Sequence, residues 1–100
     1  MIAPLYHQPL FDLGRVTATA AACQAIRDSG QDIGDFLDRH VHGDWGAIFN
    51  EDGERNVVAV ESGDPIKSVY RTDNGVKIWV VTDTIKEACR RRTTVCLPSE

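Results

Sequence analysis

The feature that most constrains this chain is a hairpin in its C-terminal half. Two runs rich in β-branched and aromatic residues, 66–72 and 76–82, flank Asp73-Asn74-Gly75, a sequence typical of a tight β-turn. The second run carries large apolar residues at both odd and even positions, so both of its faces are apolar. We therefore predict a hairpin whose second strand is central in a sheet.

Further strands are expected on either side of this hairpin in the sequence. Residues 93–97 read as a last strand stopped by Pro98, and residues 11–17 alternate imperfectly, as a short first strand would. Residues 83–92 carry apolar side chains at helical spacing before three consecutive arginines.

Two helices are predicted between the first strand and residue 42. The first has Thr17 or Thr19 as its N-cap and an alanine-rich face, and it ends near Gly30. The second opens at Asp32, which can cap its first turn, and carries an apolar face on which His40 also falls.

Residues 51–61 are ambiguous on local grounds. Glu51, Asp52 and Glu54 suit the start of a helix, because acids stabilise the positive end of the helix dipole. The apolar run 57–60 instead favours a strand, and Gly53 weakens a helix.

Length and composition indicate one domain. A chain of 100 residues with 42% hydrophobic and 26% charged residues fits a single core over 11–100, with the proline-containing segment 1–10 as an extended arm. No apolar run reaches the roughly 18 residues of a membrane span, and 1–10 does not read as a secretion signal. Three cysteines, 23, 89 and 96, form no C-x-x-C pair. We expect a cytoplasmic protein that needs no cofactor and no membrane.

Charge is unevenly distributed along the sequence. Residues 28–64 hold ten acids against two bases, and residues 65–92 hold seven bases against three acids, in a chain of net charge −4. An acidic half could bind a basic partner, for which the candidate residues are Asp35, Asp38 and Glu54. The basic half could bind nucleic acid through Arg90, Arg91 and Arg92.

The stretch from His40 to Asn50, H-V-H-G-D-W-G-A-I-F-N, is the densest group of chemically capable residues. Its two glycines allow sharp turns that present Asp44 to its surroundings and fold Trp45 back onto the core, and both residues are candidate binding residues. His40, His42 and Asp44 superficially suggest metal ligands, but a closed zinc site needs a fourth, and we predict no metal.

Several short motifs resemble a family of small uncharacterised proteins found on bacterial plasmids and other mobile elements. They are L-G-R-V-T-A-T at 13–19, H-V-H-G-D-W-G at 40–46, N-V-V-A-V at 56–60, S-V-Y at 68–70, I-W-V-V-T-D at 78–83 and R-T-T-V-C-L-P-S-E at 92–100. The resemblance implies a helix at 51–61 and a role at the boundary between mobile element and host, and it brings no biochemical activity. This chain departs from the family between 83 and 92, where its connection is longer.

The predicted fold is therefore α+β: a short N-terminal strand, three helices and a three-stranded antiparallel meander, with the first strand added to the sheet and the helices on one face. The other face, with Lys67, Val69, Arg71, Lys77 and Trp79, is where we expect a partner.

Two functions remain open from the sequence. The first is a non-catalytic interaction protein, an accessory or anti-defence factor that binds a host protein or protein–nucleic acid complex. The second is a small metal-independent ribonuclease of barnase-like or RelE-like architecture, an analogy of fold alone. Its candidate residues are His40 or His42 as general base, Tyr70 as proton donor, and Arg15, Arg91 or Arg92 on the phosphate.

Overall fold

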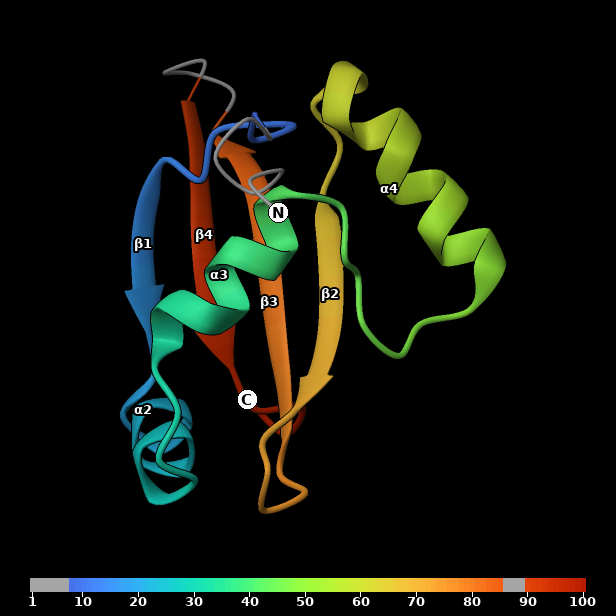
Figure 1. Ribbon diagram of the computed structural model, residues 1–100. Coiled ribbons are helices and arrows are strands. Elements are labelled where there is room, and N and C mark those ends of the chain that lie inside the picture. Colours follow the sequence, from blue (N-terminus) through green and yellow to red (C-terminus); the bar gives the residue numbers. More distant parts are fainter. Residues whose placement is uncertain (1–7, 86–89) are drawn as a thin grey trace.

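The computed structural model describes residues 8–85 and 90–100 and has an α+β fold (Figure 1). In chain order the elements are β1 (Arg15–Ala18), α2 (Ala20–Asp28), α3 (Ile33–Val41), α4 (Asn50–Ser62), β2 (Ile66–Arg71), β3 (Lys77–Ile85) and β4 (Arg90–Cys96). The predicted order of one strand, three helices and a meander is confirmed, and residues 51–61 are helical.

The four strands form one mixed sheet in the order β1-β4-β3-β2. β2, β3 and β4 pair antiparallel, and β1 joins the far edge parallel to β4. The hairpin closes where expected: the amide of Thr72 donates to the carbonyl of Val76 and the amide of Gly75 to the carbonyl of Thr72, both at 2.8 Å. β3 lies between two neighbours, so the prediction of a central strand is also confirmed.

β1 begins later than the sequence suggested. Phe11 lies outside the strand, buried in the core, and pairing with β4 starts at Arg15. The cause is Gly14, which has a φ of 63° and approaches β4 so closely that a Cβ would lie 1.7 Å from the carbonyl oxygen of Arg91. A backbone in this left-handed conformation interrupts an extended run, so residues 11–14 cannot belong to β1.

The described residues of 83–92 lie in strands, although apolar side chains stand at helical spacing in this stretch of the sequence. β3 runs to Ile85 and β4 starts at Arg90, and residues 83–85 pair with 90–92 across the antiparallel ladder. Sheet pairing with the buried β3 outweighs the local helical pattern. Residues 86–89, including Cys89, lie outside the described part of the chain, as do residues 1–7 of the expected arm.

The helix starts follow the predicted capping residues. The Thr19 hydroxyl oxygen accepts a hydrogen bond from the amide of Ala22, and Asp32 and Asp35 form a reciprocal capping box at α3. α2 ends at Asp28 with Ser29 as its C-cap, and Gly30 then turns the chain with a φ of 77°.

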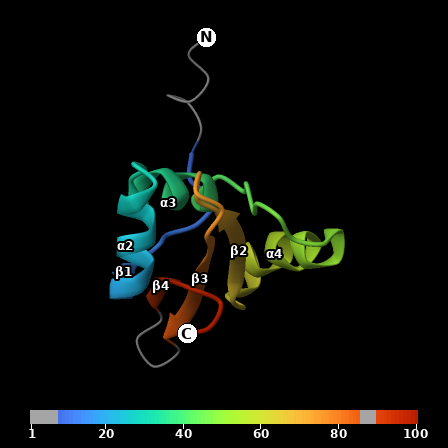
Figure 2. The same ribbon diagram turned by 90° about the horizontal axis from the view of Figure 1, so that it is seen from below.

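α2 and α3 lie on one face of the sheet, and α4 lies beside the β2 edge (Figure 2). The main core is formed by apolar residues of α2, α3 and the sheet: Ala22, Ile26, Phe36, Tyr70, Ile78, Val80 and Val95. A second cluster under α4 contains Phe11, Val41, Ala59 and Ile66. Among the described residues, no helix is long and apolar enough to cross a membrane.

The outer edge of β2 is occupied rather than open. The side chain of Asn56 on α4 donates to the carbonyl of Lys67 at 2.8 Å and accepts from its amide at 3.1 Å. Two strand positions further on, Val69 exchanges backbone hydrogen bonds with Trp45 and Ala47, at 3.0 and 2.8 Å. An exposed strand edge invites pairing with another chain, so these contacts block that pairing and hold α4 to the sheet.

We expect Asn56→Ala to lower the free energy of unfolding by about 2 kcal/mol, because two hydrogen bonds are lost and the backbone groups of Lys67 are left without them. Urea unfolding measures this loss. Asn50→Ala, at an exposed position of the same helix, is the matched control and should change stability by no more than about 0.5 kcal/mol. Equal effects of the two substitutions would contradict the edge-blocking role of Asn56.

Candidate functional site

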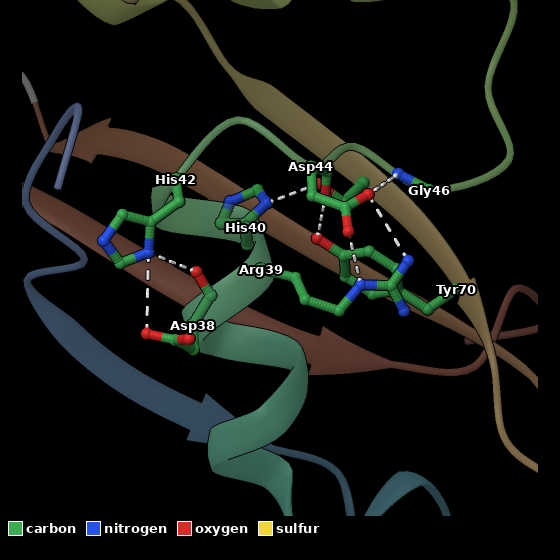
Figure 3. Close-up of polar contacts among 8 residues, drawn as sticks. Asp38, Arg39, His40, His42, Asp44, Gly46 and Tyr70 are labelled. Atoms are coloured by element: carbon green, nitrogen blue, oxygen red, sulfur yellow. Dashed lines mark hydrogen bonds and ion pairs between the residues drawn. The ribbon is translucent and has the colours of Figure 1, made fainter. Parts of the chain in front are cut away.

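The turn that follows α3 is held by an ion pair between Arg39 and Asp44. The guanidinium donates Nε–H to Oδ2 at 2.7 Å and Nη2–H to Oδ1 at 3.3 Å, while Oδ1 also accepts from the amide of Gly46 (Figure 3). Hydrogen bonding from Arg39 is the main reason that the pKa of Asp44 lies below its ordinary value. The hydroxyl of Tyr70 donates to the backbone carbonyl of Asp44. The guanidinium carbon of Arg39 lies 4.4 Å from the centre of the Tyr70 ring. Asp44 is thus engaged within the fold, although its side chain remains half exposed.

His40 is buried with an exposed fraction of 0%, and each of its ring nitrogens is hydrogen-bonded to a hydroxyl group. Nδ1 lies 2.6 Å from Ser68 Oγ, and Nε2 lies 2.9 Å from Thr82 Oγ1, which lies 2.8 Å from Thr93 Oγ1. Thr93 donates its hydroxyl hydrogen to the carbonyl of Leu13. Thr82 must therefore donate to Thr93 and accept from Nε2–H, so that Nδ1 accepts from Ser68. This chain of hydrogen bonds fixes one neutral tautomer of His40.

Burial also keeps His40 neutral. Loss of solvent lowers its pKa from 6.5 to about 4. The rings of Phe11 and Trp45 approach its imidazole edge-on, with centroids 5.1 and 5.9 Å away. Trp45 folds back onto the core as the sequence predicted, packing against the cluster under α4. A general base must reach its substrate, and here both ring nitrogens of His40 are hydrogen-bonded within the core.

The other candidate catalytic residues do not converge on one point. His42 caps the end of α3, where its Nδ1 lies 2.7 Å from the carbonyl oxygen of Asp38. Tyr70 is buried, and burial raises its pKa above the ordinary value of 10.0. Arg15 and Arg92 lie opposite each other on neighbouring strands, on the face of the sheet turned away from α3. The geometry therefore gives no support to the ribonuclease constellation.

The arginine triplet is divided by the alternation of β4. Arg91 points to the helix side and donates from Nη2 to the carbonyls of Ala59 and Val60, at 3.2 and 3.0 Å. These are carbonyls of the last turns of α4, where a cation is favourable. Arg90 and Arg92 point to the opposite face and are exposed. The three guanidinium groups consequently cannot bind one phosphate together.

The three residues that superficially suggested a metal site are also apart. His40 lies in the core, His42 contacts Asp38, and Asp44 pairs with Arg39. Within 8–85 and 90–100, no three His, Cys, Asp or Glu side chains are placed to hold a metal ion together.

The acidic candidates are distributed over two helices. Asp35 is used in the capping box of α3, where it accepts from the amide of Asp32 at 3.2 Å. Asp38 is exposed on α3, with 77% of its side chain accessible, and Glu54 is exposed on α4. Beside Glu54, the apolar side chains of Val57 and Val58 are also exposed, so the outer surface of α4 is both acidic and apolar.

The sheet has one face that α2 and α3 leave uncovered, which we call the open face (Figure 2). Strand alternation and register assign the following described residues to it: Arg15, Thr17, Lys67, Val69, Arg71, Lys77, Trp79, Val81, Asp83, Ile85, Arg90, Arg92, Thr94 and Cys96. Six of the chain's eleven lysines and arginines lie here, with a single described acid, Asp83. The open face is therefore strongly positive on a chain whose net charge is −4.

A groove borders the open face where β2 and β3 meet the segment before α4. Its volume is about 430 Å³, and Lys67, Lys77 and Trp79 line one side while Phe49 and Arg55 line the other. The Lys67 ammonium lies 3.5 Å from the centre of the Trp79 ring. Phe49 is 76% exposed, which is unusual for a phenylalanine. Asp52 also lines the groove and lies 3.6 Å from Arg55.

Sequence reasoning anticipated part of this surface. It named Lys67, Val69, Arg71, Lys77 and Trp79, because the hairpin periodicity reveals which residues share a face. It did not connect Arg15 and Arg92 to them, since only the sheet order brings these two residues beside β3. It also missed Phe49, whose exposure depends on where α4 stands.

Comparison of the whole chain with known proteins finds no family model, curated protein or solved structure that matches it.

Proposed function

We propose that this protein is a non-catalytic interaction protein, an accessory or anti-defence factor of a mobile element, which binds a host protein or protein–nucleic acid complex through the open face. The observation that carries the proposal is the concentration of six basic residues with one described acid on a sheet face that α2 and α3 leave uncovered. Separated charge of this kind steers a partner of opposite charge to one surface.

The saturation of the candidate catalytic groups supports a binding role over catalysis. His40 and Tyr70 are buried and hydrogen-bonded within the fold, and Arg91 is directed at the end of α4. Buried polar networks of this kind stabilise one arrangement of the core. The part of the chain that remains available to another molecule is the surface, and its most distinctive area is the open face.

Charge reversal on the open face should abolish partner capture. The test is a pull-down of the tagged protein from a bacterial lysate, with and without nuclease, comparing wild type with the double variant Lys67→Glu, Arg92→Glu. A specific partner recovered by the wild type is expected to be lost, because both reversals place negative charge where the partner is negative.

The matched control reverses two exposed acids instead, Asp38→Lys and Glu54→Lys. It should retain the partner, and loss of capture in this control alone would transfer the binding site to the acidic helices. Purified protein should also leave RNA uncleaved. Cleavage that disappears in His42→Ala or Arg92→Ala would show the non-catalytic assignment to be wrong.

A further inference from the structure

We infer that the open face binds single-stranded nucleic acid, with the phosphates on its basic residues and a base in the groove beside Trp79. The inference rests on the proposed function, since it takes the open face as the binding surface and names the chemistry of what binds there.

Basic residues occur on all four strands, in two neighbouring pairs with Lys67 between them. Arg15 on β1 lies opposite Arg92 on β4, whose other neighbour is Asp83 on β3, and Arg71 on β2 lies opposite Lys77 on β3 near the hairpin turn. Lys67 lies opposite Val81, so uncharged strand positions separate the two pairs. Neighbouring strands are about 4.8 Å apart, and residues on one face of a strand recur about every 7 Å. Arg15 and Arg92 are therefore close neighbours, as are Arg71 and Lys77, and an extended strand that crosses the open face can contact the two pairs and Lys67 at intervals along its phosphates. Three of these five basic residues are arginines, whose planar guanidinium groups suit bidentate phosphate contacts.

The groove supplies the second element that a single strand needs, an aromatic surface for unpaired bases. Trp79 and Phe49 line a volume of about 430 Å³ together with Lys67 and Lys77. In the free protein the Lys67 ammonium covers the Trp79 ring at 3.5 Å. Base–aromatic stacking is stronger than an exposed cation–π contact, so a base can displace this ammonium. The released Lys67 charge is then available to the adjoining phosphate.

The shape of the surface favours a single strand over a duplex. Sequence-independent binding of single strands combines positive charge along the backbone with aromatic stacking. Duplex DNA conceals its bases within the helix and is read by a helix or ribbon inserted into a groove. On the open face the aromatic side chain of Trp79 lies among strand residues, and neither α2 nor α3 projects from it.

The experiment is fluorescence anisotropy with the purified full chain and a labelled oligouridine of about 16 nucleotides. Affinity should fall steeply between about 50 mM and 200 mM salt, as counterions compete for the phosphates. Arg92→Gln and Lys67→Gln should each weaken binding several-fold and reduce the slope of log K against log salt by about 0.7. The matched control is Arg27→Gln, which removes the same charge at an exposed position of α2. It should leave the affinity and the salt slope unchanged.

Stacking is tested separately from charge. Trp79→Leu, which keeps an apolar side chain, should weaken binding about tenfold with an unchanged salt slope. A folded far-ultraviolet circular dichroism spectrum is required of each variant. As a measurement on the unaltered protein, the oligouridine should quench tryptophan fluorescence with the same midpoint as the anisotropy change.

The inference is overturned by absence of salt-sensitive oligouridine binding, by equal effects of Arg27→Gln and Arg92→Gln, or by a duplex of equal length that binds as tightly as the single strand. Polyglutamate that competes as well as oligouridine would also overturn it and indicate an acidic protein partner. In each of these cases the proposed function stands if Lys67→Glu, Arg92→Glu still abolishes capture of a nuclease-resistant partner. It fails if that capture is unaffected.

Discussion

Acidification from pH 7 to pH 4 is expected to lower the free energy of unfolding by about 3 kcal/mol, because His40 is buried in its neutral form. In the unfolded chain its pKa is 6.5, and in the folded protein burial lowers it to about 4. Between these values the unfolded state binds more protons than the folded state, so stability rises with pH. The contribution of neutral His40 to the free energy of unfolding is fully present above pH 6.5 and is lost as the pH falls toward 4.

The origin of this dependence can be isolated by substitution. His40→Gln should be less stable at pH 7, yet its stability should change far less between pH 6.5 and 4.5. Urea unfolding across this range measures both effects. Asp44 contributes at lower pH, since Arg39 lowers its pKa below 3.8 and that stabilisation is lost only as Asp44 is protonated. If His40→Gln retained the wild-type slope, another group would be responsible.

Gly46→Ala should destabilise the protein by about 3 kcal/mol or more. At a φ of 73°, an added Cβ would lie 2.0 Å from the carbonyl oxygen of Val69 and 2.7 Å from a ring carbon of Tyr70. The left-handed conformation costs about 1 kcal/mol for alanine. Relieving the overlap also requires the turn to move off β2, which breaks the hydrogen bonds of Trp45 and Ala47 with Val69.

Gly75→Ala is the matched control for this effect. Gly75 has a φ of 85°, and nothing lies within 4 Å of the position that its Cβ would occupy. The control should therefore lose only the conformational contribution, about 1 kcal/mol, in the same thermal or urea unfolding experiment. Equal losses at the two positions would mean that close approach to β2 is unimportant at Gly46.

The contacts that hold α4 to the sheet also help to shape the candidate binding surface. Asn56 attaches the helix to Lys67, and Lys67 in turn covers Trp79 on the open face. The contacts that block the β2 edge therefore also place Phe49 and Arg55 opposite Trp79 in the groove. We expect these contacts to reduce the freedom that the groove loses when a partner binds.

Local sequence patterns determined the elements of this protein. The Asp73-Asn74-Gly75 turn, the capping residues Thr19 and Asp32, and the alternation along β3 each act within a few residues. Their effects depend on backbone preferences and hydrogen bonds that the neighbouring chain supplies. The hairpin, the helix starts and much of the open face could accordingly be predicted from sequence.

Tertiary structure alone decided where those elements meet. Parallel pairing of β1 with β4 brings Arg15 to Arg92, and alternation along β4 turns Arg91 toward α4. Both ring nitrogens of His40 are hydrogen-bonded because the hydroxyls of Ser68 and Thr82, 28 and 42 residues away in sequence, lie beside them. Such contacts arise from burial and pairing between distant segments, so no local pattern encodes them, and they decide which charged groups remain available to a partner.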